Sequence, residues 1–399
     1  MTVTHDRKRL LILSSIVALG PLAIDMYLPS LPALQSHFHS TPAAAQLTLS
    51  FYFLGLAVGQ MFYGPISDRI GRLRPLRFGL ALFVLASLGC VLAPGIGALA
   101  ALRLLQALGG CAGMVIVRAI VRDLYPPQDM ARVLSLMLLI MGVAPVLAPL
   151  VGGWIFTAFG WQAIFVLLML YGAACLTLVS RALPETAPPS TARLHPAHVL
   201  GAYLRMLRHR KFMGYALAGG IAQAGMFAYI SASSFVFMGV YGASANVYGV
   251  IFGVNACGLI AGSQLNARLT RTHRSERILV RALTGYAAAG LVLLASACFA
   301  RGGILSIAVP LFCCIACLGF TFPNSTAAAM APWGDRAGTA SALLGSLQFA
   351  LASCSSALVG RLHDDTARPM AAVISLCGLG ALLMLRTLAR PHESAEAIA

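Results

Sequence analysis

The sequence predicts an all-α polytopic membrane protein in which twelve transmembrane helices form two pseudo-symmetric six-helix bundles. Of the 399 residues, 59% are hydrophobic and 10% are charged, whereas ordinary globular chains carry about 25% charged residues. Twelve apolar runs follow one another along the chain, each near the roughly 20 residues that cross a hydrocarbon core. Basic residues gather in alternate connections between the runs. A soluble domain with a normal solvated surface is therefore excluded.

The first six helices are expected where apolar runs end at charged residues, glycine or proline. They cover residues 10–29, 47–66, 76–94, 98–119, 133–155 and 161–182. The first run follows Arg7-Lys8-Arg9, a start that signal peptides share, but the eleven further runs favour an uncleaved helix. Residues 1–183 are thus the predicted N-terminal bundle.

The other six helices are expected in a C-terminal bundle and tail at residues 212–399. They cover residues 212–236, 246–267, 278–299, 303–325, 338–360 and 369–389. Residues 184–211 form a cytoplasmic linker. Five apolar linker residues share one helical face, with arginines elsewhere: Val199, Leu200, Tyr203, Leu204 and Leu207. This pattern predicts an amphipathic helix lying on the membrane surface.

Arginine and lysine are unevenly distributed between the two sides of this topology. Most lie in the connections after helices 2, 4, 6 and 8, whereas the opposite side has only Arg301, Arg361 and Arg368. Basic loops stay in the cytoplasm. We therefore expect a multi-pass protein of the cell inner membrane with both termini cytoplasmic.

The two halves carry a weak internal repeat after their second helices. Gly64-Pro-Ile-Ser-Asp68-Arg69 corresponds to Gly262-Ser-Gln-Leu-Asn266-Ala267. Together with the equal helix count, this echo supports two six-helix repeats, an arrangement that places a substrate site near the midplane between them.

Asp25 is the one acidic residue that falls inside a predicted membrane helix. The other eleven lie in loops, helix ends or tails. An embedded carboxylate is costly and usually faces a cavity on an ion or substrate path. Its protonation responds to burial and to nearby charge, so it suits a proton site. The alternative is that Asp25 lies high enough to touch water.

Arg103 stands about one turn inside the predicted fourth helix, at a depth like that of Asp25. It is the expected cation near that carboxylate. The alternative is an arginine whose long side chain reaches back to the outer interface.

The fifth helix contains two prolines four residues apart and a glycine pair: Pro145, Pro149, Gly152 and Gly153. Prolines bend a helix and glycines allow close backbone approach. Generic kinking explains these residues, but they also suit a helix that packs against the other half while rocking.

The loop after helix 2 holds an aspartate between two glycines. We expect a conformational latch here, formed by Gly64, Asp68, Arg69, Gly71 and Arg72. An aspartate near a helix N-terminus gains from the helix dipole, so Asp68 is expected to hold the two halves together in one state only. The alternative, an ordinary basic cytoplasmic loop, explains the arginines but not Asp68.

These motifs together resemble the major facilitator superfamily, and within it the drug:proton antiporters of the bicyclomycin and chloramphenicol resistance type. The resemblance runs over essentially the whole chain. It rests on five motifs in order: Asp25-Met-Tyr-Leu-Pro29, the loop Gly64 to Arg74, Arg103-Leu-Leu-Gln106-Ala-Leu-Gly109, Ala148-Pro149-Leu150-Val151-Gly152-Gly153, and Leu183-Pro184-Glu185-Thr186. Two departures, Ala148 for a glycine and Leu73 for a basic residue, concern packing more than mechanism.

The resemblance implies export of small, drug-like molecules in exchange for protons by two rocking bundles, with no cofactor and no metal. Asp25 would hold the proton and Arg103 would modulate its release. Helix position and polarity assign nine residues to the substrate cavity: Tyr27, Tyr52, Gln60, Met226, Phe227, Tyr229, Asn255, Asn324 and Gln348. The expected partners are a small-molecule substrate, protons and the lipid bilayer, and the chain is expected to be a monomer.

Other functions fit the sequence less well, with one exception. A dedicated exporter of one small metabolite, such as an amino acid or nucleobase, is not distinguished from a drug exporter. A membrane-embedded enzyme is disfavoured because all nine histidines lie outside the twelve spans. A nucleotide-driven pump is disfavoured because it would need a Gly-rich loop ending in Gly-Lys-Ser/Thr, and the sequence contains none. Nucleic-acid binding is disfavoured because the net charge of +16 is split into short groups.

Overall fold

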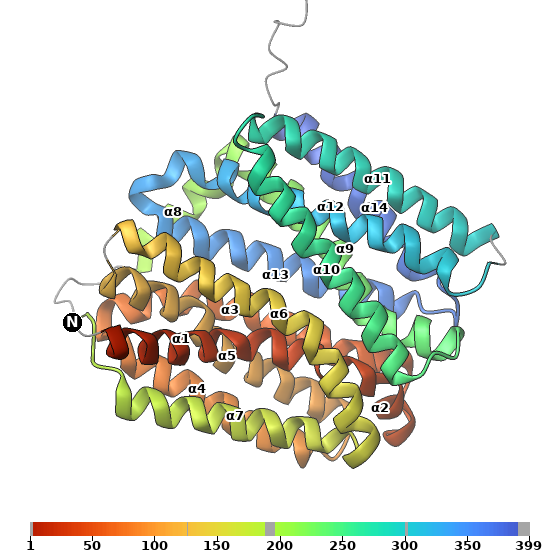
Figure 1. Cartoon of the computed structure of the whole chain (residues 1–399), viewed down its shortest axis with the longest axis horizontal. Helices are drawn as coiled ribbons and strands as arrows, with labels where there is room; N and C mark the ends of the chain where they lie inside the picture. Colours follow the sequence, from red (N-terminus) through yellow and green to blue (C-terminus); the bar gives the residue numbers. More distant parts are fainter. Residues whose placement is uncertain (1–2, 126, 188–195, 300–301, 390–399) are drawn as a thin grey trace, which may run out of the picture.

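The computed structural model describes residues 3–125, 127–187, 196–299 and 302–389, and all regular secondary structure in these ranges is helical (Figure 1). The N-terminal helices are α1 (Val3–Asp25), α2 (Leu31–His37), α3 (Pro42–Ile70), α4 (Leu73–Val91), α5 (Ile96–Leu124), α6 (Pro127–Phe159) and α7 (Trp161–Ala182). The linker helix is α8 (Pro196–Arg208). The C-terminal helices are α9 (Arg210–Ser234), α10 (Ala245–Leu269), α11 (Ser275–Phe299), α12 (Leu305–Met330), α13 (Ala337–Arg361) and α14 (Arg368–Met384).

Short helical segments extend several of these helices. A 3-10 turn, η1 (Leu28–Ser30), joins α1 to α2, and another, η3 (Ala331–Arg336), joins α12 to α13. Two π-helical turns, η2 (Phe235–Val240) and η4 (Leu385–Ala389), continue α9 and α14. Each of the twelve predicted spans overlaps a helix. Within the described residues, eleven helical segments are long and apolar enough to cross a membrane, and α6 occupies the place of the remaining predicted span.

The first helix ends earlier than predicted. The expected span reached residue 29, but α1 ends at Asp25 and the chain then turns through η1 into α2. Pro29 explains this, because a proline at that position has no N–H to donate to the carbonyl of Asp25 and its ring clashes with that carbonyl. Asp25 is therefore the last residue of a helix and not an interior one.

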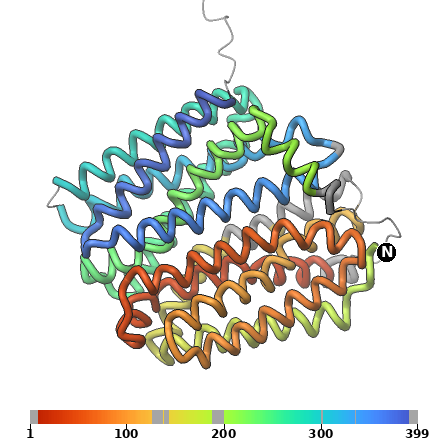
Figure 2. Tube along the Cα trace, turned by 180° about the vertical axis from the view of Figure 1, so that it is seen from behind, coloured from red at the N-terminus to blue at the C-terminus, as the bar shows by residue number. Residues whose placement is uncertain are grey.

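The helices divide into two sets, α1–α7 and α9–α14, that pack mainly within themselves (Figures 1 and 2). The sets meet chiefly through α3 against α13 and α6 against α10. In Figure 1 the N-terminus and α8 lie at one end of the helices and α2 lies at the other. We refer to these as the α8 end and the α2 end.

Helices α3 and α13 run antiparallel, with small polar residues at their contact. Near the α2 end, Ser50 Oγ donates to Ser356 Oγ over 2.9 Å, and Ser353 Oγ donates to the backbone carbonyl of Ser50 over 2.8 Å. Closer to the α8 end, a Cβ on Gly345 would clash with the Gln60 amide. The two sets are thus in contact from the α2 end past the middle of α3.

Helices α6 and α10 form the second contact between the sets. A Cβ on Gly153 would lie 3.3 Å from the carbonyl of Ala245, and one on Gly249 would lie 2.8 Å from the Leu150 side chain. Both pairs lie toward the α2 end, because α6 ends and α10 begins there. The structure therefore has this end closed.

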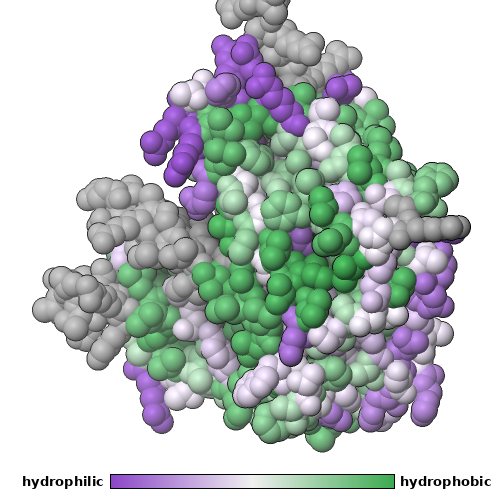
Figure 3. Space-filling model, turned by 45° about the vertical axis from the view of Figure 1, so that its right-hand side comes forward, coloured by the Kyte–Doolittle hydropathy of each residue, from purple (hydrophilic) through white to green (hydrophobic). Residues whose placement is uncertain are grey.

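The outer surface of the long helices is largely apolar. Large exposed hydrophobic side chains occur on most of the long helices, for example Phe78, Leu170 and Leu376, which are 57–65% exposed. Figure 3 shows a broad hydrophobic region on one face with hydrophilic residues gathered mainly at its margins. This distribution is typical of a protein solvated by a bilayer.

Candidate transport site

Asp25 is buried at the junction of α1 and η1. Its exposed fraction is 4%, so the alternative of a carboxylate at the water interface does not describe this conformation. In the described part of the chain, the ion pairs are Arg72 with Asp68, Arg72 with Asp123 and His363 with Asp365. Asp25 belongs to none of them. It lies near the tyrosines Tyr52, Tyr229 and Tyr248, of which the last two belong to the other set of helices.

Arg103 on α5 is fully buried inside the N-terminal helices, which excludes a side chain that reaches the interface. Its Nη1 donates to Gln106 Oε1 over 2.6 Å, and its Nη2 donates to the backbone carbonyl of Ala23 over 3.0 Å. Ala23 lies two residues before Asp25. Arg103 is thus joined to the backbone of the helix that carries Asp25, and not to the carboxylate itself.

Three aromatic rings surround the Arg103 guanidinium. Its central carbon lies 4.2 Å from the ring centroid of Tyr52, 4.6 Å from that of Tyr27 and 5.8 Å from that of Phe165. Cation–π contacts of this kind are worth about 2 kcal/mol or more when desolvated. The rings therefore offset part of the cost of burying an arginine without a paired carboxylate.

Gln106 belongs to the fourth-helix motif that begins at Arg103, but no role was predicted for it. It is fully buried, accepts from Arg103, and donates through Nε2 to Ser87 Oγ over 2.8 Å. The two hydrogen bonds form a series, Arg103–Gln106–Ser87, that links α5 to α4. The amide fixes the orientation of the guanidinium.

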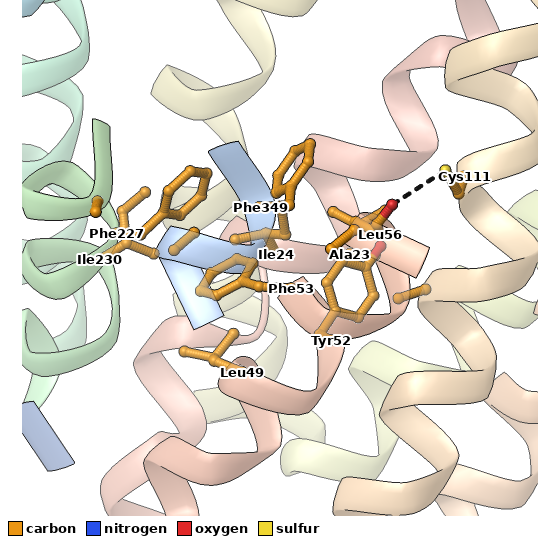
Figure 4. Packing of buried hydrophobic residues seen from close by; sticks show 14 of the residues in the cluster. Ala23, Ile24, Leu49, Tyr52, Phe53, Leu56, Cys111, Phe227, Ile230 and Phe349 are labelled. Atoms are coloured by element: carbon orange, nitrogen blue, oxygen red, sulfur yellow. Dashed lines mark hydrogen bonds between the residues drawn. The ribbon is translucent and has the colours of Figure 1, made fainter. Parts of the chain in front are cut away.

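Three phenylalanines fill the space between the two sets near mid-depth. The ring of Phe227 on α9 lies 4.5 Å from that of Phe53 on α3 and 5.7 Å from that of Phe349 on α13. Figure 4 shows this cluster beside Ile24 and Tyr52. Phe227, a predicted cavity residue, therefore packs between α3 and α13 in this conformation.

Two further predicted cavity residues pair with each other in the C-terminal helices. Asn255 Nδ2 donates to Tyr229 OH over 3.0 Å, and the Tyr229 ring stacks on Phe252 with centroids 5.4 Å apart. Tyr27 hydrogen-bonds to Thr48 over 2.8 Å. Gln60 and Gln348 are also buried and Met226 is half-buried.

Asn324, another predicted cavity residue, also forms its hydrogen bonds within the C-terminal helices. Its Nδ2 donates to Asn266 Oδ1 over 2.6 Å and to the carbonyl of Phe320 over 2.8 Å. This pair joins α10 to α12 within the C-terminal helices, because a buried amide needs partners and α10 supplies one. Helix position alone did not indicate which way the side chain points.

The two glycines of the fifth-helix motif contact different sets of helices, and only Gly153 lies against the other half. Helix α6 continues through Pro145 and Pro149. A Cβ on Gly152 would clash with the backbone of Met26, next to Asp25, and Gly153 faces Ala245 of the other set. Helix α6 thus touches both the Asp25 turn and the C-terminal helices.

The loop between α3 and α4 is organised by Arg72, which is 4% exposed. Its Nε donates to Asp123 Oδ2 on α5 over 2.8 Å, and its Nη1 donates to Ser67 over 3.1 Å and to Asp68. Burial alone would lower the pKa of Arg72, but the hydrogen bonds and charges of Asp123 and Asp68 raise it. Asp123 was not predicted as a member of this loop site.

The expected place of Asp68 at a helix N-terminus is wrong. Asp68 lies in the last turn of α3, while Glu185, after α7, supplies the carboxylate at the start of α4. The backbone N–H groups of Arg72 and Leu73 donate to Glu185 over 2.7 and 3.0 Å. Gly71 has a φ of 90° and leaves room for the Glu185 carboxylate. A Cβ at this position would lie only 2.8 Å from Glu185 Oε2.

Replacing Glu185 with Gln is expected to destabilise the protein by about 1 kcal/mol at pH 7, since the lost carboxylate acts as a remote cap of α4. Partial burial would raise the pKa of Glu185, but the backbone hydrogen bonds lower it below its usual 4.5. A lowered pKa stabilises above 4.5, and that stabilisation is lost as the pH falls through the folded value. Thermal unfolding in detergent should therefore separate the two proteins most at pH 7, and the difference should shrink as the pH is lowered below 4.5.

A fold of this kind, with a buried carboxylate where two sets of membrane helices meet and a buried arginine bonded to the same helix, is typical of a secondary membrane transporter. A sequence profile of the Major Facilitator Superfamily matches residues 13–357. The chain belongs to this family.

Relatives of similar length match almost the whole chain. The chain is 36% identical to the uncharacterized MFS-type transporter YdgK of Bacillus subtilis (strain 168), covering 91% of this chain and 90% of that one. It is 30% identical to the bicyclomycin resistance protein homolog of Haemophilus influenzae, covering 92% of each. It is 29% identical to multidrug resistance protein D of Escherichia coli (strain K12), covering 95% and 92%.

Solved transporters share the fold at low sequence identity. The crystal structure of a D-xylose-proton symporter aligns over 96% of this chain and 98% of its own, with a TM-score of 0.76 and 15% identity. An inward-facing, unoccupied bacterial homolog of the lysosomal transporter Spinster aligns over 98% and 96%, with a TM-score of 0.72 and 16% identity. These likenesses concern the fold alone.

Proposed function

We propose that the protein is a proton-coupled antiporter that exports small, drug-like molecules across the cell inner membrane, with both termini cytoplasmic. The observation that carries the proposal is the buried pair of charged groups at the α1–α5 contact, with Asp25 as proton site and Arg103 attached to its helix. The names of two relatives as bicyclomycin and multidrug resistance proteins support the substrate class.

In the proposed cycle, residues 1–183 and 212–399 rock as two bodies about the linker. Protonation of Asp25 removes a charge from a site next to the C-terminal tyrosines, and burial of a neutral group costs less than burial of a charge. The protonated protein is therefore expected to favour the closed contacts at the α2 end. Release of the proton would then favour opening and the exchange for substrate.

The substrate surface is proposed to combine aromatic and amide groups that become accessible when the two bodies separate. Tyr52, Phe227, Tyr229 and Asn255 are all buried in this conformation. A mostly apolar surface with few polar groups suits uncharged or amphipathic compounds. No covalent chemistry is needed, so we propose a carrier that is not an enzyme and acts as a monomer.

The proposal predicts that a panel of unrelated apolar drugs releases protons from the purified protein in weakly buffered detergent solution. Cells that overproduce the protein should accumulate less of the same drugs, and a proton uncoupler should abolish the difference. Proton release by only one small metabolite, such as an amino acid or nucleobase, would instead identify a dedicated exporter. Release by no compound would refute proton-coupled export.

A further inference from the structure

A groove of about 460 Å³ opens on the surface where α6 of one set meets α10 and α12 of the other. Val146 and Leu150 form its wall on α6, Gly253, Cys257 and Ala261 form its floor on α10, and Phe312 closes it on α12. Its volume lies within the range of about 300–1,000 Å³ that small-molecule sites show. The groove is separate from Asp25 and from the proposed substrate surface.

Small residues on α10 create the hollow. A Cβ on Gly258 would lie 2.6 Å from the Phe312 ring, so this ring packs directly on the α10 backbone. A Cβ on Gly253 would lie 3.6 Å from the Val146 side chain. The helices therefore meet at these glycines, while Cys257 between them remains exposed. The space that larger side chains would occupy stays open toward the outside.

The rim of the groove continues into the surface that faces lipid. Val250 and Val254, which line it, and the nearby Leu147 and Val309 are 52–59% exposed. The groove residues 250–261 extend about 16 Å along the middle of α10, at 1.5 Å per residue. This depth lies within the hydrocarbon core, where a polar occupant would find no hydrogen-bond partners on an apolar lining.

We propose that this groove binds one acyl chain of a membrane phospholipid and that the bound chain favours the conformation closed at the α2 end. Because its walls come from both sets of helices, the groove changes shape whenever α6 and α10 separate. A ligand that binds one conformation better shifts the equilibrium toward it. The binding step depends on the fold alone, whereas its effect on transport also rests on the proposed function.

The binding step is tested with a phosphatidylcholine that carries a diazirine at mid-chain, in nanodiscs of otherwise unlabelled phosphatidylcholine. Photolysis and peptide mass spectrometry should find labelling of residues 250–261 several-fold above that of Leu376 and Leu383, which are equally exposed on α14. Cys257→Phe should fill the groove and reduce its labelling several-fold. Cys298→Phe, at an exposed cysteine of α11, is the matched control and should leave it unchanged.

Several outcomes would overturn the proposal. Equal labelling of α10 and α14 would mean that both helices merely touch bulk lipid. If an exported drug, but not excess phospholipid, prevents the labelling, the groove is a drug site. If Cys257→Phe does not fold, Ala261→Leu replaces it. The effect on transport is read as the rate of α2-end opening by fluorescence quenching between labels on α2 and η2. A rate unchanged by Cys257→Phe, while labelling is lost, would refute the conformational part and leave proton-driven export untouched.

Discussion

Replacing Asp25 with Asn should reduce proton-driven export in proteoliposomes to the level of empty liposomes. In the described part of the chain, Asp25 is the buried carboxylate between the two sets of helices, and it has no ion-pair partner there. Asn has nearly the same shape but cannot bind or release a proton. A pH gradient would therefore no longer act on the conformational equilibrium.

The same variant should keep its fold and its exchange of substrate for substrate. Burying a neutral amide costs less than burying a charge, so the thermal stability of Asp25→Asn should equal or exceed that of the wild type. Counterflow of labelled substrate without a pH gradient should persist, because it needs only the rocking motion. Asp365→Asn is the matched control, since this carboxylate is 94% exposed in the loop before α14. Undiminished pH-driven export by Asp25→Asn would remove Asp25 from the mechanism.

The positions of the helices follow from the sequence because hydrophobicity is a local property. Each apolar run has to form a helix in lipid, where every backbone polar group must be satisfied internally. Asp25 was identified for the same reason, as the lone acid within these runs. The early end of α1 also has a local cause, Pro29, but the apolar residues on both sides of Asp25 made the helix look continuous to residue 29.

The partners of the buried polar groups do not follow from the sequence, because they depend on how helices rotate against one another. Glu185 caps α4 across 112 residues of chain, and no spacing rule connects the two. An acid directly after α7, among basic loop residues, was the available signal. Asn324 is similar, since its partner Asn266 lies 58 residues away and no spacing rule identifies it.

Replacing Arg103 with Met should destabilise the protein and uncouple it. The substitution keeps a flexible, unbranched side chain but removes the guanidinium, so Gln106 and the carbonyl of Ala23 each lose a buried hydrogen bond. A buried polar group left unpaired costs about 1–3 kcal/mol. Thermal unfolding in detergent should therefore show a loss of roughly 2–6 kcal/mol, from two such groups.

Arg103→Lys separates the charge from the geometry. Lysine keeps the cation near Asp25, but its single ammonium group cannot reproduce the planar, two-sided contact with Gln106 and Ala23 between the rings of Tyr27 and Tyr52. We expect this variant to fold and to retain substrate counterflow, while transporting fewer protons per substrate than the wild type. The ratio is measured by the reversal potential of transport in proteoliposomes. A wild-type ratio in Arg103→Lys would show that charge alone suffices, and a wild-type ratio in Arg103→Met would limit Arg103 to a structural role.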